Sequence, residues 1–160
     1  MKIEMRALSA IKPYENNPRV NDNAVDAVAR SIQEFGFRQP IVVDGEGVII
    51  CGHTRYKAAL LLKLPTVPVH VATDLTPEQI KAYRITDNRV AENSRWDDEL
   101  LPIELKDLED KGVDLKITGF TEKELTEWMH RFDTSLDGGT GGDVNMKTAR
   151  CPKCGHEFPL

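Results

Sequence analysis

The sequence has few cysteines, no long apolar run and no excess of basic residues. Three cysteines occur among 160 residues, and nothing in their spacing suggests the disulfide framework of a small secreted protein. No apolar run is long enough to cross a bilayer, so no membrane association is expected. The first residues lack the basic-then-apolar order of a secretion signal. We therefore expect a cytoplasmic protein with one full domain and appendages.

The formal net charge of −5 argues at first against nucleic acid as a partner. The charge is unevenly divided along the chain. Residues 1–95 hold 13 Lys and Arg against 11 Asp and Glu, a net of +2, whereas residues 96–160 hold 8 against 15, a net of −7. The mildly basic front half is compatible with contact to DNA phosphates.

A short stretch near residue 50 is the best candidate for a binding site. Residues 48–51 (Val-Ile-Ile-Cys) predict a buried strand, Gly52 interrupts it, and helix-forming residues follow from Thr54. A helix N-terminus directly after a glycine turn leaves backbone N–H groups unpaired and attracts anions. Arg55 and Lys57 on the first turns would add positive charge for a phosphate. The same pattern also fits plain architecture, with Thr54 as the N-cap.

Three motifs, in order, resemble the ParB/sulfiredoxin superfamily. Residues 52–59 (Gly-His-Thr-Arg-Tyr-Lys-Ala-Ala) are similar to its Gly-x-x-Arg-x-x-Ala-Ala signature. Residues 17–19 (Asn-Pro-Arg) resemble its early Asn-Pro-Arg element, and residues 36–43 (Gly-Phe-Arg-Gln-Pro-Ile-Val-Val) its Gly-x-x-x-Pro-Ile-x-Val segment. The resemblance implies an α+β fold with a small mixed sheet and flanking helices.

The resemblance also implies a nucleotide site, because in that superfamily the turn before the helix holds nucleotide phosphates. Members include DNA-partition CTPases, the ATP-using sulfiredoxin and a free-serine kinase, so the implied ligand is CTP or ATP with Mg²⁺. A single carboxylate is enough for Mg²⁺ when phosphates and water complete its shell. The expected phosphate-binding residues are Gly52, His53, Thr54, Arg55, Arg38, Gln39, Arg19 and Asn88, and the expected Mg²⁺ ligand is Asp87. The catalytic residue is unknown.

Local patterns give reasons for some of these residues to converge. Asp44-Gly45 between two apolar runs predicts a hairpin, which would bring the Arg38 loop and the Gly52 turn to the same end of the sheet. A capping box at residues 76–79 starts a later helix that carries Asp87 and Asn88. These two residues resemble the Glu-Asn pair of ParB-type proteins, although they could equally mark only the end of a helix.

Two further patterns concern the core. Apolar residues at helical spacing predict a first helix over residues 21–35 whose stripe is buried in the core. Its members are Val25, Val28, Ile32 and Phe35. Pro68 lies in the apolar run 67–71, which predicts either an edge strand or the start of a strand.

The chain changes character after residue 95. We expect a ParB/sulfiredoxin-like nucleotide-binding domain over 1–95, a helical extension over 96–132, a flexible linker over 133–148 and a half zinc-ribbon knuckle over 149–160. The extension is acidic, so we expect no helix-turn-helix with a basic recognition helix and no sequence-specific DNA binding by this chain alone. Such helical tails resemble those of phage and mobile-element ParB-like proteins, often next to DNA methyltransferases.

The last residues contain Cys151 and Cys154 in a Cys-Pro-x-Cys-Gly turn, which is typical of a zinc knuckle. Structural zinc takes four protein ligands, and this segment supplies two cysteines with His156 as a third candidate. The site is therefore incomplete. We favour zinc shared between two chains, as in a homodimer, with His130 as the alternative donor.

Three functions remain open at this point. The first is a ParB-like protein that binds CTP or ATP on or beside DNA, with slow hydrolysis. The second is a small-molecule or nucleoside kinase; sulfiredoxin chemistry is disfavoured because His53 stands where that enzyme has its cysteine and Cys51 lies in an apolar run. The third is a non-enzymatic adaptor for a DNA methyltransferase. Nuclease activity has no support, because no two-metal carboxylate constellation is present.

Overall fold

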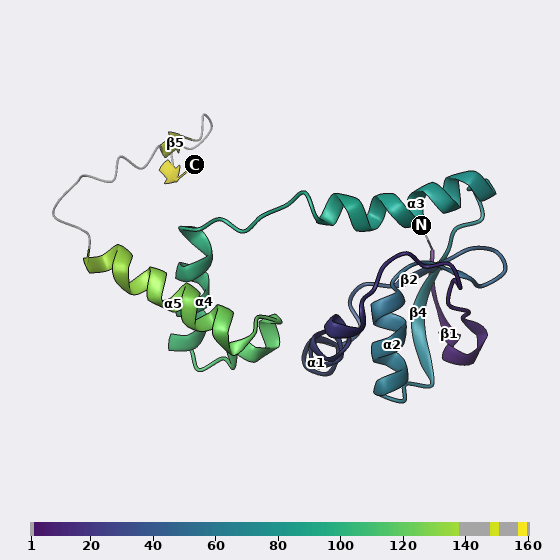
Figure 1. Ribbon diagram of the computed structural model, residues 1–160, viewed down its shortest axis with the longest axis horizontal. Helices are drawn as coiled ribbons and strands as arrows, with labels where there is room; N and C mark the ends of the chain where they lie inside the picture. Colours follow the sequence, from purple (N-terminus) through teal and green to yellow (C-terminus); the bar gives the residue numbers. More distant parts are fainter. Residues whose placement is uncertain (1, 138–147, 151–156, 160) are drawn as a thin grey trace.

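A computed structural model describes residues 2–137, 148–150 and 157–159. Figure 1 shows an N-terminal domain and a helical extension, joined by the long helix α3 and an extended segment. In chain order the elements are β1 (Ile3–Ala7), η1 (Leu8–Ala10), η2 (Asp22–Ala24), α1 (Val25–Phe35), β2 (Ile41–Val43), β3 (Ile49–Cys51), α2 (His53–Leu61), β4 (Thr66–Val71), α3 (Pro77–Ala91), α4 (Leu100–Asp110), η3 (Leu115–Thr118), α5 (Glu122–Asp137), β5 (Thr148–Arg150) and β6 (Glu157–Pro159). None of the helices in the described part of the chain could span a membrane.

The N-terminal domain is built on a four-stranded sheet in the order β1-β4-β2-β3. β1 and β4 are antiparallel, β4 and β2 are parallel, and β2 and β3 are the two strands of the expected antiparallel hairpin. The expectation of a small mixed sheet with flanking helices is confirmed. A separate antiparallel pair, β5 with β6, brackets the cysteine segment, and both cysteines lie outside the described residues.

The position of Pro68 corrects the sequence prediction. Pro68 is the third residue of β4, which lies inside the sheet and not at its edge. The N–H of Ala72 donates to the Val43 carbonyl (2.8 Å), so alternate N–H groups along β4 face β2. By the same alternation, a backbone N–H at position 68 would point toward the carbonyl of residue 39, which precedes the first residue of β2. The missing proline N–H breaks no hydrogen bond of the ladder.

The two faces of the sheet bury different sets of side chains. On one face, the strands pack against Ala59 of α2 through Ile41, Val43, Ile49, Val67 and Val69, all at 0% exposure. On the other face, Ile50, Cys51 and Ala72 pack against Ile80 of α3. Because β3 lies between these two layers, its end and the turn that follows are held between α2 and α3.

The ends of the helices follow the expected local chemistry. α3 begins with a capping box at Thr76, whose side chain and that of Gln79 bond each other's backbone N–H groups, with Pro77 as the first helical residue. α1 ends at Gly36, which has a positive φ of 76°. The α1 stripe, however, is less buried than predicted: Phe35 is 46% exposed. Its outer end borders a groove and does not enter the core.

One buried cation ties α3 to the rest of the domain. Arg84, 8% exposed, donates from Nε to the Ile49 carbonyl (3.0 Å) and pairs through Nη2 with the Asp44 carboxylate (3.5 Å). Its guanidinium also stacks on the Tyr14 ring, 3.9 Å from the centroid. Asp44 in turn accepts the N–H groups of the hairpin turn, so Arg84 links α3, the hairpin and the loop before η2.

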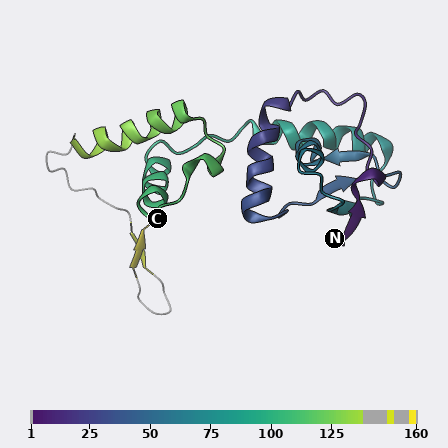
Figure 2. The same ribbon diagram turned by 90° about the horizontal axis from the view of Figure 1, so that it is seen from below.

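The helical extension consists of α4, η3 and α5. The Asp97 side chain accepts two N–H groups at the start of α4, and Thr121 and Glu124 form a capping box at the start of α5. Figures 1 and 2 agree that α1 lies on the side of the N-terminal domain that faces the extension, and η3 contacts it. α5 continues to Asp137, so the stretch 133–148 begins as helix and not as the predicted linker.

Replacement of Arg84 by methionine is expected to lower the free energy of unfolding by about 3 kcal/mol, because the Asp44 carboxylate would stay half-buried without its cation. Urea denaturation followed by circular dichroism measures the change. The matched control is Arg89→Met on the same helix. Arg89 is 67% exposed and its ion pair with Glu92 is worth at most about 1 kcal/mol. Equal losses in the two variants would contradict the anchoring role of Arg84.

Candidate functional site

A cavity of about 250 Å³ lies where β3 ends and α2 begins. It is bounded by the Gly52 turn, the first turn of α2, one face of α3 and the loop before η2. The lining residues are Asn17, Arg19, Asn21, Val28, Ile50, Cys51, Gly52, His53, Thr54, Arg55, Asp87 and Asn88. The structure therefore brings seven of the nine predicted nucleotide and Mg²⁺ residues to one cavity; Arg38 and Gln39 lie outside it.

Gly52 sets the direction of α2. It is the N-cap of the helix with φ 104° and ψ 27°, a left-handed conformation that only glycine adopts freely. The alternative of Thr54 as N-cap is wrong, because Thr54 is already the second helical residue. No side chain caps this N-terminus, so its first N–H groups stay available next to the cavity. This end of the helix favours an anion.

Arg55 is held close to that turn. Its Nη1 donates to the Gln39 side-chain oxygen, whereas its Nε is buried and has no hydrogen-bond partner. Burial lowers the pKa of Arg55, and the nearby Asp87 and Cys51 partly oppose the shift. No carboxylate among the described residues forms an ion pair with this guanidinium. A half-buried cation with a buried N–H that has no acceptor favours an anionic partner.

His53 contributes as a neutral ring. Its Nε2 accepts the backbone N–H of Tyr14 at 3.2 Å, which places the ring proton of the neutral form on Nδ1. Burial, followed by the positive charges of Arg84 and Lys57, lowers the pKa of His53 below its usual value. His53 therefore holds the Tyr14 loop over the cavity and can offer a neutral N–H donor.

α3 supplies the acidic side of the cavity. Asp87 and Asn88 line it, and α3 continues past them to Ala91, so the reading that this pair only ends a helix is wrong. Asn88 Nδ2 donates to the Arg84 carbonyl one turn earlier (2.8 Å), which fixes the amide. Asp87 lies near enough to Arg55 and Cys51 to raise the pKa of both groups.

Two predicted phosphate ligands have other partners in this structure. Arg19 lines the cavity, but its guanidinium pairs with Glu92, the residue after α3, which also pairs with Arg89 (3.0 Å). Arg38 donates from Nε to the Phe35 carbonyl at the end of α1. With Gln39 and Arg55, it lines a neighbouring groove of about 400 Å³. Arg55 thus borders both hollows, and Arg38 reaches only the second.

Some residues were missed or misassigned by sequence reasoning. Lys57 was expected near the phosphate, but its ammonium binds Asn21 (2.8 Å) and Asp22 (2.6 Å) at the start of η2. Tyr14 and Arg84 carried no motif, yet together they position the loop over the cavity. A signal for Arg84 existed: it follows Ile80 by four residues, on the buried face of α3.

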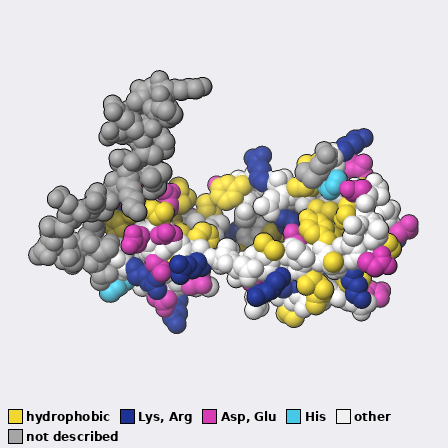
Figure 3. All heavy atoms as spheres, turned by 90° about the horizontal axis from the view of Figure 1, so that it is seen from above, with side chains coloured by type: hydrophobic (Ala, Val, Ile, Leu, Met, Phe, Trp, Pro, Cys, Tyr) yellow, Lys and Arg dark blue, Asp and Glu magenta, His cyan; other side chains and the backbone are white. Residues whose placement is uncertain are grey.

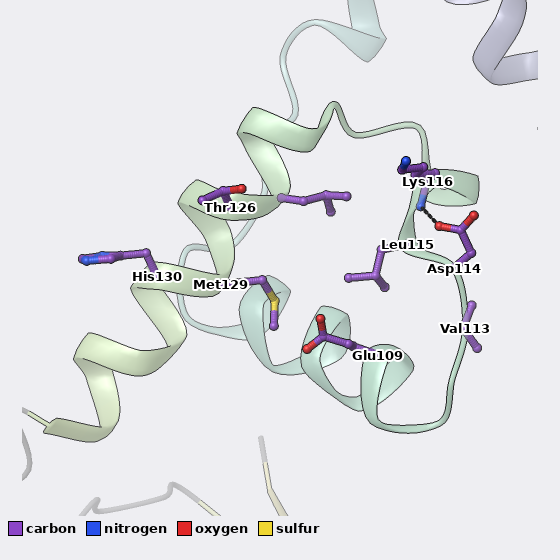
Figure 4. A pocket seen from close by; sticks show the side chains of 9 residues that line it. Glu109, Val113, Asp114, Leu115, Lys116, Thr126, Met129 and His130 are labelled. Atoms are coloured by element: carbon purple, nitrogen blue, oxygen red, sulfur yellow. Dashed lines mark hydrogen bonds between the residues drawn. The ribbon is translucent and has the colours of Figure 1, made fainter.

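A larger hollow of about 600 Å³ lies in the helical extension, away from Gly52 (Figure 4). Figure 4 shows Met129 of α5 and Leu115 of η3 pointing into it, with the Glu109 side chain of α4 between them. His130 also lines it. Its walls are mainly apolar, and none of the predicted nucleotide residues reaches it.

The comparisons with known proteins agree with this architecture. The family model described as the ParB N-terminal domain matches residues 1–88, more than half of the chain. The chain belongs to the ParB N-terminal domain family. The resemblance inferred from the motifs at residues 17–19, 36–43 and 52–59 is thereby confirmed.

Two relatives show how far the similarity extends. The ParB-like nuclease domain-containing protein YnaK of Escherichia coli is 41% identical over 80 residues, which are 49% of this chain and 92% of YnaK. A probable chromosome-partitioning protein ParB of Campylobacter jejuni is 29% identical over 141 residues, which are 82% of this chain and 46% of that protein. The chain thus spans most of YnaK and less than half of the partitioning protein.

A solved structure has the same fold. It is the C-terminally truncated chromosome-partitioning protein ParB from Caulobacter crescentus, complexed with CTP-gamma-S. The TM-score is 0.68 at 20% identity, and the match covers 87% of this chain and 86% of that one. At this identity the match shows that the chain has a ParB-type fold.

The second family match corrects one expectation. Residues 99–149 match a family model described as the ParB-methyltransferase HTH domain. The acidic charge of the extension predicts no helix-turn-helix with a basic recognition helix. The match indicates a helix-turn-helix arrangement in this region, whereas the lack of a basic recognition helix stays a prediction. α4, η3 and α5 lie within this match.

Gly52→Ala is expected to lower the free energy of unfolding by about 1 to 2 kcal/mol, because a Cβ in the left-handed region is strained. That Cβ would also lie 3.1 Å from Arg55 Nε. The control is Gly45→Ala, where no atom lies within 4 Å of the new Cβ and φ is not positive, so the change should stay within about 0.5 kcal/mol. Chemical denaturation of both variants tests this; a harmless Gly52→Ala would contradict it.

The Cys51 thiol should be unreactive in the folded protein. Burial, followed by the charge of Asp87, raises its pKa to about 12, so about one thiol in ten thousand is ionised at pH 8. Iodoacetamide at pH 8 should label Cys51 far more slowly than in urea, as peptide mass spectrometry can measure. Because the folded pKa is the higher one, this thiol lowers stability as the pH rises from 9.0 toward 12. Equal labelling in both states would contradict the assignment.

Proposed function

We propose that this chain binds a nucleoside triphosphate, CTP or ATP with Mg²⁺, at the Gly52 turn. The observation that carries the proposal is Arg55: a half-buried side chain whose buried Nε has no hydrogen-bond partner among the described residues, beside a helix N-terminus that no side chain caps. Both features favour an anion at the same place. Thr54, His53 and Asn88 supply further donors around the cavity, and Arg19 would exchange Glu92 for a phosphate oxygen.

The two hollows have sizes that suit two different parts of a nucleotide. The cavity of about 250 Å³ suits the phosphates, and the groove of about 400 Å³ beyond Arg55 suits the nucleoside. Arg38 and Gln39 would then contact the part of the nucleotide next to Arg55. The Caulobacter protein with this fold is complexed with a CTP analogue, which supports CTP as the first nucleotide to test.

Asp87 is the proposed ligand for Mg²⁺. Its carboxylate faces the cavity near Arg55, and Mg²⁺ commonly takes one carboxylate together with phosphates and water. Within the described ranges no group of three His, Cys, Asp or Glu side chains forms a site by itself. Slow hydrolysis would rest on electrostatic stabilisation of the transferring phosphoryl group by Arg55 and the helix N-terminus.

The place of action is proposed to be on or beside DNA. Several relatives are named as chromosome-partitioning proteins, and residues 99–149 match a helix-turn-helix family. On the face shown in Figure 3, Lys and Arg side chains are interspersed with Asp and Glu. The name of the second family also favours a second function, an adaptor for a DNA methyltransferase, which would bind nucleotide without turnover.

Calorimetry of the full chain with CTP, ATP and GTP, each with Mg²⁺, tests the proposal. Arg55→Ala should weaken binding by about 10- to 100-fold, because a charge-assisted contact to phosphate is lost. The matched control is Arg30→Ala: Arg30 is exposed on α1 and lines neither hollow. Circular dichroism confirms that both variants are folded.

Equal affinities of Arg55→Ala and the unmodified chain would overturn the site while leaving the fold intact. Release of phosphate from bound nucleotide would favour the NTPase over the adaptor. Transfer of labelled γ-phosphate to serine or a nucleoside would replace both with a kinase.

A further inference from the structure

The two edges of the sheet differ in how they are covered. At the β3 edge, Ile49 donates its N–H to the Lys12 carbonyl (2.9 Å) and accepts Arg84 Nε at its own carbonyl (3.0 Å). Lys12 also forms a parallel bridge with Val48. That edge is closed by the chain itself. β1 forms the other edge, at the outer margin of the sheet in Figure 1.

The register of β1 shows which of its groups face outward. Leu8 donates its N–H to Pro65 across β4, so Arg6 and Glu4 also face β4 by the two-residue alternation. The backbone groups of Ile3, Met5 and Ala7 therefore face away from the sheet. None of the described residues hydrogen-bonds to them. An open edge of this kind is a template for another strand.

The side chains of β1 add two further features. Ile3 and Met5 are 50% and 63% exposed, which is high for large apolar residues on a strand. Glu4 and Arg6 lie on the opposite face and pair with each other at 2.5 Å, with side chains still 41% and 31% exposed. The strand thus presents apolar side chains on one face, and one acid and one base on the other.

We propose that β1 pairs antiparallel with β1 of a second copy of this chain, about a two-fold axis at Met5. This register joins the outward groups of Ile3, Met5 and Ala7 to those of the second copy, and it makes one continuous eight-stranded sheet. It places Glu4 opposite Arg6 of the second copy, and Arg6 opposite its Glu4, in the closer, non-hydrogen-bonded positions. The two Met5 side chains meet on the apolar face.

The charges select this arrangement over its alternatives. An axis at Glu4 or at Arg6 would set two like charges directly opposite each other, Glu4 against Glu4 or Arg6 against Arg6. A parallel, in-register pair would stack Glu4 on Glu4 and Arg6 on Arg6. The axis at Met5 is the one that pairs the whole strand with opposite charges. The proposal does not depend on nucleotide, so it is tested in its absence.

The sharpest test is Met5→Pro against Met5→Ala, with sedimentation equilibrium of the full chain without nucleotide. The Met5 N–H has no partner among the residues that the structure describes, so its loss should leave the monomer folded by circular dichroism. In the dimer, the same change removes the two central hydrogen bonds. Met5→Pro should weaken dimerisation at least tenfold relative to Met5→Ala, which keeps the N–H.

Charge reversal is an independent test of the register. Glu4→Arg and Arg6→Glu should each weaken the dimer at least tenfold, and the double variant should restore it, because opposite charges again face each other. An unmodified chain that stays monomeric at several hundred micromolar would overturn the proposal. A dimer that Met5→Pro and both single reversals leave unchanged would also overturn it. Neither result would bear on nucleotide binding at Gly52.

Discussion

The Arg84 guanidinium joins three parts of the chain that are distant in sequence: the Tyr14 loop, the hairpin at Asp44 and Ile49, and α3. Burial of such a charge is costly unless its partners are well placed, so the three parts are fixed relative to one another. Asp87 lies one turn further along α3 and therefore faces the Gly52 turn. The position of Asp87 at the cavity thus depends on Arg84, which does not line the cavity itself.

The cavity contains a positive charge whose hydrogen bonds are not all satisfied by the described residues. Arg55 is half-buried beside a helix N-terminus, and its buried Nε has no partner among the described residues. A fold tolerates such a group when other contacts stabilise it, here the bond to Gln39 and the more distant charge of Asp87. Gly52 makes the arrangement possible, because a side chain at that position would meet the guanidinium. An anion at this position would supply the acceptor that Arg55 Nε lacks, which is the physical reason for the proposed site.

The sequence predicted those features that depend on neighbouring residues. The Asp44-Gly45 hairpin, the Thr76 capping box and the strand-glycine-helix junction follow from local chemistry, and all are present. Long-range features were missed. The interior position of β4 depends on which strands pair, and the partners of Arg84 come from 35 to 70 residues earlier in the chain. Arg19 lines the cavity as its sequence position suggested, its role toward phosphate stays a prediction, and its pairing with Glu92 could not be read from spacing.

The acidic helical extension can be reconciled with a helix-turn-helix family through its ion pairs. Its basic side chains each face a carboxylate of the same unit: Lys106 with Glu109 and Asp110, Lys111 with Asp107, Lys116 with Glu122, Lys123 with Glu127 and Arg131 with Asp98. Exposed pairs of this kind contribute at most about 1 kcal/mol each, so a DNA phosphate could replace the carboxylate at little cost. The displaced acid would remain near the phosphate and repel it. Binding through this unit alone would therefore be weak and strongly dependent on salt, and the mildly basic N-terminal domain would have to add the missing attraction.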